Sequence, residues 1–267
     1  TKRLAFCFDI LLMSKLPAAY QFIDLSDYGR KPARWIARSL KNTKATPIHV
    51  TLAFGVVGLI ACYFILSHHF LLAGIFLILK SILDAADGEL ARVKATPSYS
   101  GRYLDSIFDI VLNFLVLGCI WYVTSGPLII ALLAFIGIQL QGTLYNYYYV
   151  ILRNEFDGDD TSRINEKKAP IALPGEKQEL VNVLYAIFNI LYRVFDQAIY
   201  YADPDAPKKQ NIPNWFMTLV SALGLGSQLL IIAAMLAFNL EHYILPFLLS
   251  YTVAIPLLII VRRQVNR

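Results

Sequence analysis

The 267-residue sequence is poor in charged residues and in cysteine. Asp, Glu, Lys and Arg make up 16% of it, and 57% of its residues are hydrophobic. An average soluble domain has about a quarter charged residues. With a mean hydropathy of +0.53, this shortage of charge argues against an ordinary soluble enzyme and a disordered chain. The three cysteines, Cys7, Cys62 and Cys119, include no pair at metal-ligand spacing, so neither a zinc ribbon nor a disulfide framework is expected.

The sequence also lacks the short motifs of common soluble catalysts. It contains no glycine-rich phosphate loop of the Walker type, no serine-centred nucleophile elbow and no HExxH motif. The net charge is +5. A basic face for nucleic acid is not needed to explain this charge, because the basic residues gather in the links between apolar runs and at the termini.

Long apolar runs dominate what is present. Six of them predict membrane-crossing helices, at 48–67, 70–83, 103–124, 128–150, 215–238 and 243–261. A span needs about 20 residues, so the second must continue through Asp84 and Asp87. The links at 67–69, 125–127 and 239–242 contain no Lys or Arg, whereas the other links and both termini do. The positive-inside rule therefore predicts cytoplasmic termini in an inner or equivalent membrane.

Two further segments are polar. Residues 29–44 predict a basic amphipathic helix along the headgroup surface, with a solvated leader as the alternative. In the predicted cytoplasmic loop 154–213, residues 176–203 have helical periodicity, and four charged residues in them favour an interfacial helix over a seventh span. We predict an all-α integral membrane protein with a juxtamembrane segment at 1–48 and a six-helix domain at 49–267.

Four aspartates stand at the ends of two consecutive predicted spans, where an ionisable group is costly and needs a reason. Asp84 and Asp87 are three residues apart, and Asp105 and Asp109 are four apart, so each pair shares a helix face. The two helices form a hairpin that turns all four carboxylates toward one cavity at the cytoplasmic interface. Such oxygen ligands suit Mg²⁺, Mn²⁺ or Ca²⁺. We predict a divalent-metal site open to a phosphorylated substrate; the alternative is a set of solvated helix-end acids.

These acids belong to a longer pattern, Asp84-x2-Asp87-Gly88-x2-Ala91-Arg92-x8-Gly101-x3-Asp105-x3-Asp109. The pattern resembles the signature of the CDP-alcohol phosphotransferase family at every fixed position. The resemblance implies a dimeric membrane enzyme that moves a substituted phosphate from a CDP-linked alcohol to a second alcohol and releases CMP. It also implies two divalent cations, Mg²⁺ or Mn²⁺.

The resemblance further implies roles for single residues. The four aspartates would bind the metals, and Asp109 would also take the proton from the acceptor hydroxyl. The expected nucleotide-binding residues are Asp84, Gly88, Ala91, Arg92 and Gly101. Family members often carry Thr-Pro-Asn-x-(Val/Ile)-Thr before the first span, and this chain has Thr46-Pro47-Ile48-His49-Val50-Thr51. Ile48 replaces the polar residue, and His49 is either a substitute contact or a structural residue.

The two alcohols remain open at this point. Residues 87–92 and 104–106 look more like members that use CDP-diacylglycerol, which we favour as donor; CDP-choline or CDP-ethanolamine acting on diacylglycerol is the alternative. Candidate substrate residues are Thr46, Tyr145, Tyr149 and Arg153. The tyrosines suit a quaternary ammonium through cation–π contacts or form an interfacial belt. A more distant alternative, a cation-coupled transporter, predicts acids near the midplane rather than at one interface.

Overall fold

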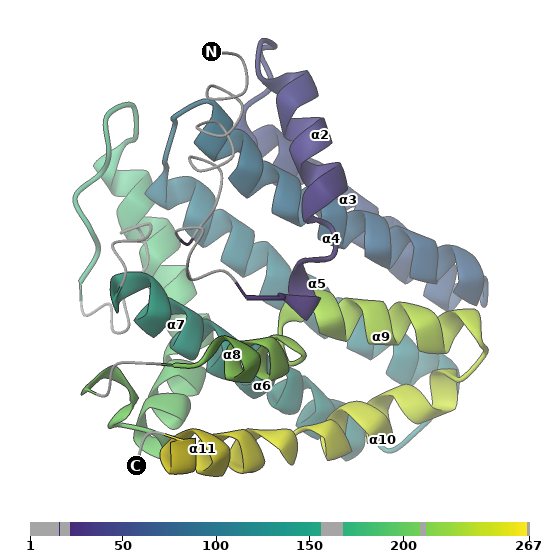
Figure 1. The fold of residues 1–267 in the computed structure, drawn as a ribbon. Coiled ribbons are helices and arrows are strands. Elements are labelled where there is room, and N and C mark those ends of the chain that lie inside the picture. The colour runs from purple at the N-terminus through teal and green to yellow at the C-terminus, as the bar shows by residue number, and fades with distance from the viewer. Residues whose placement is uncertain (1–15, 17–21, 156–167, 209–211, 266–267) are drawn as a thin grey trace.

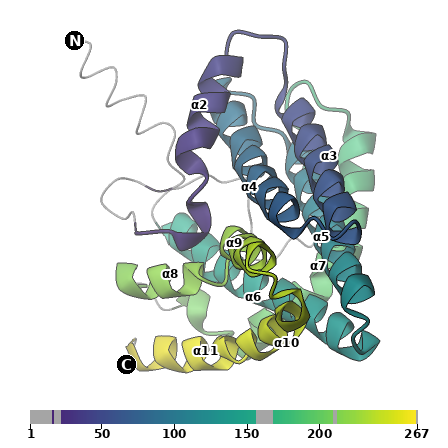
Figure 2. The ribbon, with the colours of Figure 1, turned by 90° about the vertical axis from the view of Figure 1, so that its right-hand side faces the viewer.

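The computed structural model describes residues 16, 22–155, 168–208 and 212–265, and the regular elements in them are helices (Figures 1 and 2). The all-α prediction is therefore confirmed for this part of the chain. Most of the predicted juxtamembrane segment before residue 22 and part of the predicted loop lie outside the described residues. The 3-10 helices are η2 (Leu25–Asp27) and η3 (Ala206–Lys208). The α-helices are α2 (Arg30–Leu40), α3 (Pro47–Leu66), α4 (Phe70–Val93), α5 (Tyr99–Thr124), α6 (Leu128–Glu155), α7 (Gln178–Ala202), α8 (Asn214–Ser221), α9 (Leu225–Ala237), α10 (Glu241–Tyr251) and α11 (Ala254–Val265).

Helix α3 begins with a reciprocal cap. The Thr46 hydroxyl accepts from the His49 backbone N–H at 3.4 Å, and His49 Nδ1 accepts from the Thr46 backbone N–H at 3.0 Å. Pro47 occupies the first helical position, where a missing N–H costs nothing. His49 therefore caps the start of α3. This is the structural role that the sequence left open beside a substrate contact.

Helices α3, α4 and α5 form the part of the bundle that carries the signature. Small residues on α3 let α5 approach closely: a Cβ on Gly55 would lie 2.8 Å from Phe108, and one on Gly58 would lie 2.8 Å from Leu112. Helix α4 continues through both of its aspartates to Val93, as predicted. Helix α5 begins at Tyr99, earlier than the predicted 103, because the Ser98 hydroxyl caps it by accepting from the Gly101 N–H at 2.9 Å.

Within the described residues, four helical segments are long and apolar enough to cross a membrane. They are α3, α5, α6 and the α10–α11 segment Glu241–Val265; the pair α8 and α9 would make a fifth. Helix α4 is not among them, and its 24 residues include Lys80, Asp84, Asp87, Glu89 and Arg92. The chain thus has the apolar helices of a membrane protein, and the count of six spans stays a prediction. Helix α7 is not among these segments either.

The predicted helix at 215–238 is not continuous, because α8 and α9 are bent by 45° at the break between them. Residues of η2 occupy this break. A Cβ on Gly226 would collide with the Ser26 carbonyl oxygen, and the Leu25 N–H donates to Ser221 Oγ at 2.9 Å. Both views show the chain before α2 reaching α9 (Figures 1 and 2). The bend therefore lies where Gly224 and Gly226 meet a distant segment of the chain. The predicted span at 243–261 is likewise interrupted, between α10 and α11.

Helix α2 confirms the predicted amphipathic helix. It runs beside α4 (Figure 2), and Ala33 and Ala37 are fully buried in a cluster with Ala86 and Leu90. Trp35 is exposed on the other side. Its position along the headgroup surface stays a prediction.

A buried ion pair ties α11 to the end of α7 and to α6. Asp203 is 0% exposed and pairs with Arg262 through both carboxylate oxygens, with Arg262 Nη2 at 2.5 Å. Tyr148 donates to the same carboxylate at 2.8 Å and Tyr147 to the Asp203 carbonyl at 2.9 Å. Arg263 Nε lies 3.5 Å from Asp203 Oδ1. We call these five residues the Asp203 cluster.

Candidate active site

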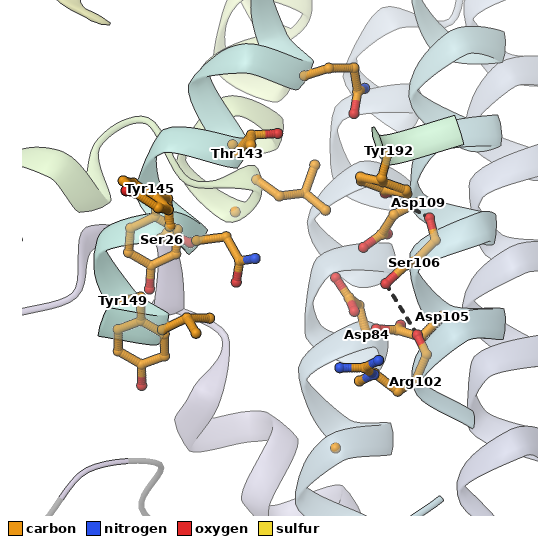
Figure 3. Close-up of a pocket in the computed structure, with 18 of the residues that line it drawn as sticks. Ser26, Asp84, Arg102, Asp105, Ser106, Asp109, Thr143, Tyr145, Tyr149 and Tyr192 are labelled. Carbon is orange, nitrogen blue, oxygen red and sulfur yellow. Dashed lines mark hydrogen bonds between the residues drawn. The ribbon is translucent and has the colours of Figure 1, made fainter. Parts of the chain in front are cut away.

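A cavity of about 790 Å³ lies among α4, α5, α6, α7 and the segment that holds η2. Figure 3 shows two facing walls: Asp84, Asp105 and Asp109 on one side, and Tyr145 and Tyr149 on the other. The predicted site residues that line the cavity are Asp84, Asp87, Gly88, Arg92, Asp105, Asp109, Tyr145, Tyr149 and Arg153. The hairpin of α4 and α5 thus brings all four carboxylates to one cavity.

Three predicted site residues are not part of this lining. Thr46 is exposed at the start of α3, where it caps the helix. Gly101 lies in the first turn of α5 beside the Ser98 cap. Ala91 is partly buried near the end of α4. Nucleotide contacts by Ala91 and Gly101 stay predictions.

Three of the aspartates form a group able to hold a metal ion. One carboxylate oxygen from each of Asp84, Asp105 and Asp109 lies within 4.8 Å of the others. Asp105 Oδ1 is buried and has no hydrogen-bond partner among the described residues. A buried, unpartnered carboxylate oxygen is costly, and a cation would satisfy it. A set of carboxylate oxygens without sulfur or imidazole fits Mg²⁺ or Mn²⁺.

Asp87 stands apart from that group. It is 7% exposed, and its Oδ2 accepts from the Thr51 hydroxyl at 2.6 Å. Thr51 is buried on α3, so this helix holds a signature carboxylate in place. The sequence shows Thr51 one turn after Pro47, but not that it reaches Asp87 on α4.

Lys80 is a buried cation in contact with two of the signature carboxylates. It is 2% exposed, donates to Asp109, and its Nζ lies 3.6 Å from Asp84 Oδ2. The Phe54 ring centre lies 4.9 Å from the same nitrogen. Four carboxylates held this close repel one another, and a bound cation would relieve that repulsion. The sequence shows Lys80 one turn before Asp84, but not that it reaches Asp109 on α5.

Arginines collect near Glu89, beside the signature. Glu89 is 1% exposed, and its Oε1 lies 3.0 Å from Arg92, 3.5 Å from Arg30 and 3.7 Å from Arg34. The predicted nucleotide contact Arg92 is therefore held by a buried carboxylate. Arg30 joins the cavity lining from α2, a role that the sequence did not reveal. Fixed guanidinium groups beside a cavity are suited to binding phosphate.

The predicted interfacial helix also takes part in the site. Glu176, just before α7, accepts from the Ser98 hydroxyl at 2.8 Å and from the backbone N–H groups of Tyr99 and Ser100 at 3.1 and 2.7 Å. Tyr192 of α7 donates to the Ser106 carbonyl at 2.8 Å (Figure 3). These contacts hold α5 at its first turn and again between the aspartates it carries. Tyr192 also lines the cavity.

The facing wall is aromatic. Tyr145 and Tyr149 stack with ring centres 5.6 Å apart, and Tyr145 donates to Asp24 Oδ2 at 2.5 Å. The Arg153 guanidinium lies 5.9 Å from the Tyr149 ring centre. The three predicted residues of α6 thus share one wall, and the segment before α2 fixes its orientation.

Known proteins resemble this chain over the same region. The model of the CDP-alcohol phosphatidyltransferase family matches residues 44–219. The bifunctional IPC transferase and DIPP synthase of Thermococcus kodakarensis is 33% identical over 154 residues, which are 57% of this chain and 33% of that protein. The archaetidylinositol phosphate synthase of Pyrococcus horikoshii is 35% identical over 80 residues, 30% of this chain and 43% of that protein.

A second bifunctional IPC transferase and DIPP synthase, from Archaeoglobus fulgidus, is 29% identical over 175 residues, 64% of this chain and 33% of that protein. The matched segments therefore cover less than half of each relative. The family match includes the whole signature, whose four acids line one cavity, and extends over more than half of the chain. On these grounds the chain is an enzyme of the CDP-alcohol phosphatidyltransferase family.

Proposed function

We propose that this enzyme transfers a substituted phosphate from a CDP-linked alcohol to the hydroxyl of a second alcohol and releases CMP, in phospholipid synthesis. We further propose that it uses two divalent cations, Mg²⁺ or Mn²⁺. The observation that carries the proposal is the convergence of Asp84, Asp105 and Asp109 on one cavity, next to guanidinium groups suited to phosphate. The four signature aspartates would hold the metals, which would neutralise the pyrophosphate and the charge that develops on CMP.

In this mechanism Asp109 acts as the general base. Its Oδ1 accepts from Lys80, so we assign Oδ2 the proton of the acceptor hydroxyl. The acceptor oxygen then bonds to the phosphorus that carries the donor alcohol, and the bond from that phosphorus to CMP breaks. Arg92 and Arg30 orient the phosphates, and the rate enhancement comes mainly from positioning and charge.

For the donor we favour a CDP-linked lipid, CDP-diacylglycerol in the first instance. For the acceptor we favour a phosphorylated polyol such as inositol phosphate. The name of the Pyrococcus horikoshii relative supports that acceptor, and Arg102, Arg153 and Arg193 line the cavity. The alternative donors CDP-choline and CDP-ethanolamine are less favoured, because Arg153 already faces the ring of Tyr149 that would hold a quaternary ammonium.

We propose six spans with both termini and the active site on the cytoplasmic side, and a homodimer. The distribution of Lys and Arg between the links supports the orientation. A cytoplasmic opening also lets a water-soluble nucleotide and a bilayer lipid meet.

The test is CMP release by the purified protein in detergent. One arm supplies CDP-diacylglycerol with inositol phosphate, inositol, glycerol phosphate or serine, and the other supplies CDP-choline or CDP-ethanolamine with diacylglycerol. We expect release in the first arm that EDTA abolishes and Mg²⁺ or Mn²⁺ restores. Release in the second arm alone would overturn the donor assignment, and EDTA-resistant release would overturn the metal dependence. No release in either arm from folded, metal-loaded protein would contradict the proposed reaction.

A further inference from the structure

The cavity continues along α5 beyond the aspartates. Asn113 follows Asp109 by four residues, as Asp109 follows Asp105, so the three side chains share one helix face. All three line the cavity. At 1.5 Å per residue, Asn113 lies about 6 Å farther along the axis of α5 than Asp109. It lies on the side away from the first turn, which Glu176 contacts.

Two amides in this part of the cavity lack partners. Asn113 is 8% exposed, and no described residue forms a hydrogen bond with its side chain. Gln139, which lines the same cavity from α6, is 6% exposed, and its Nε2 is buried with no partner among the described residues. Thr143, one turn from Gln139 on the same helix, lies on that side of the cavity (Figure 3). An unpaired buried amide such as that of Gln139 costs free energy, so a ligand that pairs with it is the expected reason for its presence, and Asn113 lines the same cavity.

Neighbouring amides show that the fold can satisfy such groups. Gln228 Nε2 donates to the Ile138 and Leu223 carbonyls, both at 3.0 Å, and to Gln141 Oε1 at 3.1 Å. Gln141 Nε2 donates to the Leu248 carbonyl and to Thr252 Oγ1, both at 3.0 Å. These two glutamines join α6, α9 and α10. Asn113 and Gln139 have no such packing role.

We propose that Asn113 and Gln139 form a subsite for the glycerol-linked oxygens of a lipid donor. The inference rests on the proposed function, which puts the donor phosphate at the aspartates. In a lipid the ester or ether oxygens follow immediately below the phosphate, toward the hydrocarbon. These oxygens accept hydrogen bonds but cannot donate them, and an amide N–H supplies the donor without a charge that would be costly at that depth.

The subsite would also choose between donor classes. CDP-choline and CDP-ethanolamine carry a short cationic group beyond the phosphate and offer no oxygen to these amides. A CDP-linked lipid offers several. Asn113 and Gln139 would therefore add affinity only for the lipid-linked donor, while the nucleotide half of either donor would bind alike.

The test compares a lipid-linked donor with its headgroup alone. Dioleoyl CDP-diacylglycerol and CDP are titrated separately into Mn²⁺-loaded protein in detergent, for wild type, Asn113→Leu and Gln139→Met. Gln141→Met is the matched control, because it removes a hydrogen-bonded amide two residues from Gln139 on the same helix. We expect Asn113→Leu and Gln139→Met to weaken CDP-diacylglycerol binding about tenfold and to leave CDP binding unchanged. The control should lower the melting temperature without changing the ratio of the two affinities.

Other results would contradict the subsite. Equal weakening of both probes, no weakening of either, or a rise in KM for the acceptor alone would each overturn it. The proposed function fails separately: wild-type protein that binds no CDP and releases no CMP would overturn the reaction and the subsite together. Wild-type activity with CDP-choline but not with CDP-diacylglycerol would overturn the subsite while the reaction class stands.

Discussion

Acidic side chains in the Asp203 cluster and in the cavity have opposite surroundings. In the Asp203 cluster one carboxylate receives two arginines and a tyrosine hydroxyl. In the cavity, Asp84 and Asp109 share the single ammonium of Lys80, and Asp105 Oδ1 has no partner among the described residues. A buried acid with full compensation holds helices together, whereas acids left in deficit mark a site that is completed by a ligand.

Replacing the proposed base should produce the largest effect. Asp109→Asn keeps the shape of the side chain but removes the proton acceptor, so we expect CMP release to fall by about 10²–10⁴. Unfolding temperature should fall by less than in Asp203→Asn, because Lys80 keeps Asp84 as a charge partner and one of four repelling charges is gone. CDP binding should be largely kept. A detergent-solubilised variant with wild-type turnover would contradict the role of Asp109 as base.

The matching change in the Asp203 cluster should have the reverse pattern. Asp203→Asn leaves Arg262 buried without its counter-charge, which costs about 3–5 kcal/mol of unfolding free energy. Turnover per folded molecule should stay near that of wild type. Chemical denaturation in detergent measures the first quantity, and CMP release normalised to the folded fraction measures the second. A stable but inactive variant would assign Asp203 a part in catalysis.

Metal binding should stabilise the folded protein through the cavity carboxylates and not through the Asp203 cluster. At a Mn²⁺ concentration 100 times its Kd, linkage predicts about 2.7 kcal/mol of added stability for wild type. Asp105→Asn should lose most of this gain, while Asp203→Asn, although less stable at the outset, should keep it. Thermal unfolding with EDTA and with Mn²⁺ separates the cases. If Mn²⁺ raised the stability of wild type and of Asp105→Asn equally, the metal would not be bound by this group of carboxylates.

A smaller effect is expected at Glu176, whose carboxylate holds the first turn of α5. Burial raises its pKa, but hydrogen bonds from Ser100, Ser98 and Tyr99 outweigh burial and bring the pKa below its ordinary value of 4.5. A lowered pKa contributes stability above the ordinary value, and that stability is lost as the pH falls through the folded-state pKa.

Glu176→Gln should therefore cost about 1 kcal/mol at pH 7, because the carboxylate is partly exposed. The difference in unfolding free energy between Glu176→Gln and wild type should disappear at a pH below the folded-state pKa. Melting temperatures at both pH values measure this, and Glu179→Gln, on the exposed first turn of α7, should match wild type throughout. A gap that is independent of pH would show that the charge of Glu176 does not hold α5.

Local chemistry was readable from the sequence. The apolar run at 48–67 predicted α3 (Pro47–Leu66) to within one residue at each end, and the spacing of Asp84, Asp87, Asp105 and Asp109 predicted four acids at one cavity. Local rules extend along one helix and into its hairpin partner, and the signature lies entirely within such a hairpin.

The remaining features depend on contacts that no local pattern encodes. Glu176 reaches α5 across 76 positions, and Ser26 packs against the break between α8 and α9 from about 200 positions away. Lys80 was visible one turn from Asp84, yet its pairing with Asp109 requires the packed geometry of α4 on α5. Helix α4 carries Lys80, Asp84, Asp87, Glu89 and Arg92 and is not among the described helices that are long and apolar enough to cross a membrane, so the count of six spans stays a prediction.

The docking of η2 into the α8–α9 break has a consequence for biosynthesis. Leu25 leaves the ribosome before Ser221, and the two lie 196 positions apart. The cavity wall that contains Asp24 and Ser26 therefore cannot close while the early helices alone have been made. We predict that chains arrested before residue 214 leave the Leu25–Ser26 bond open to chymotrypsin, and that chains extended past α9 protect it. The signature acids would thus be assembled first, and the last helices would complete the cavity around them.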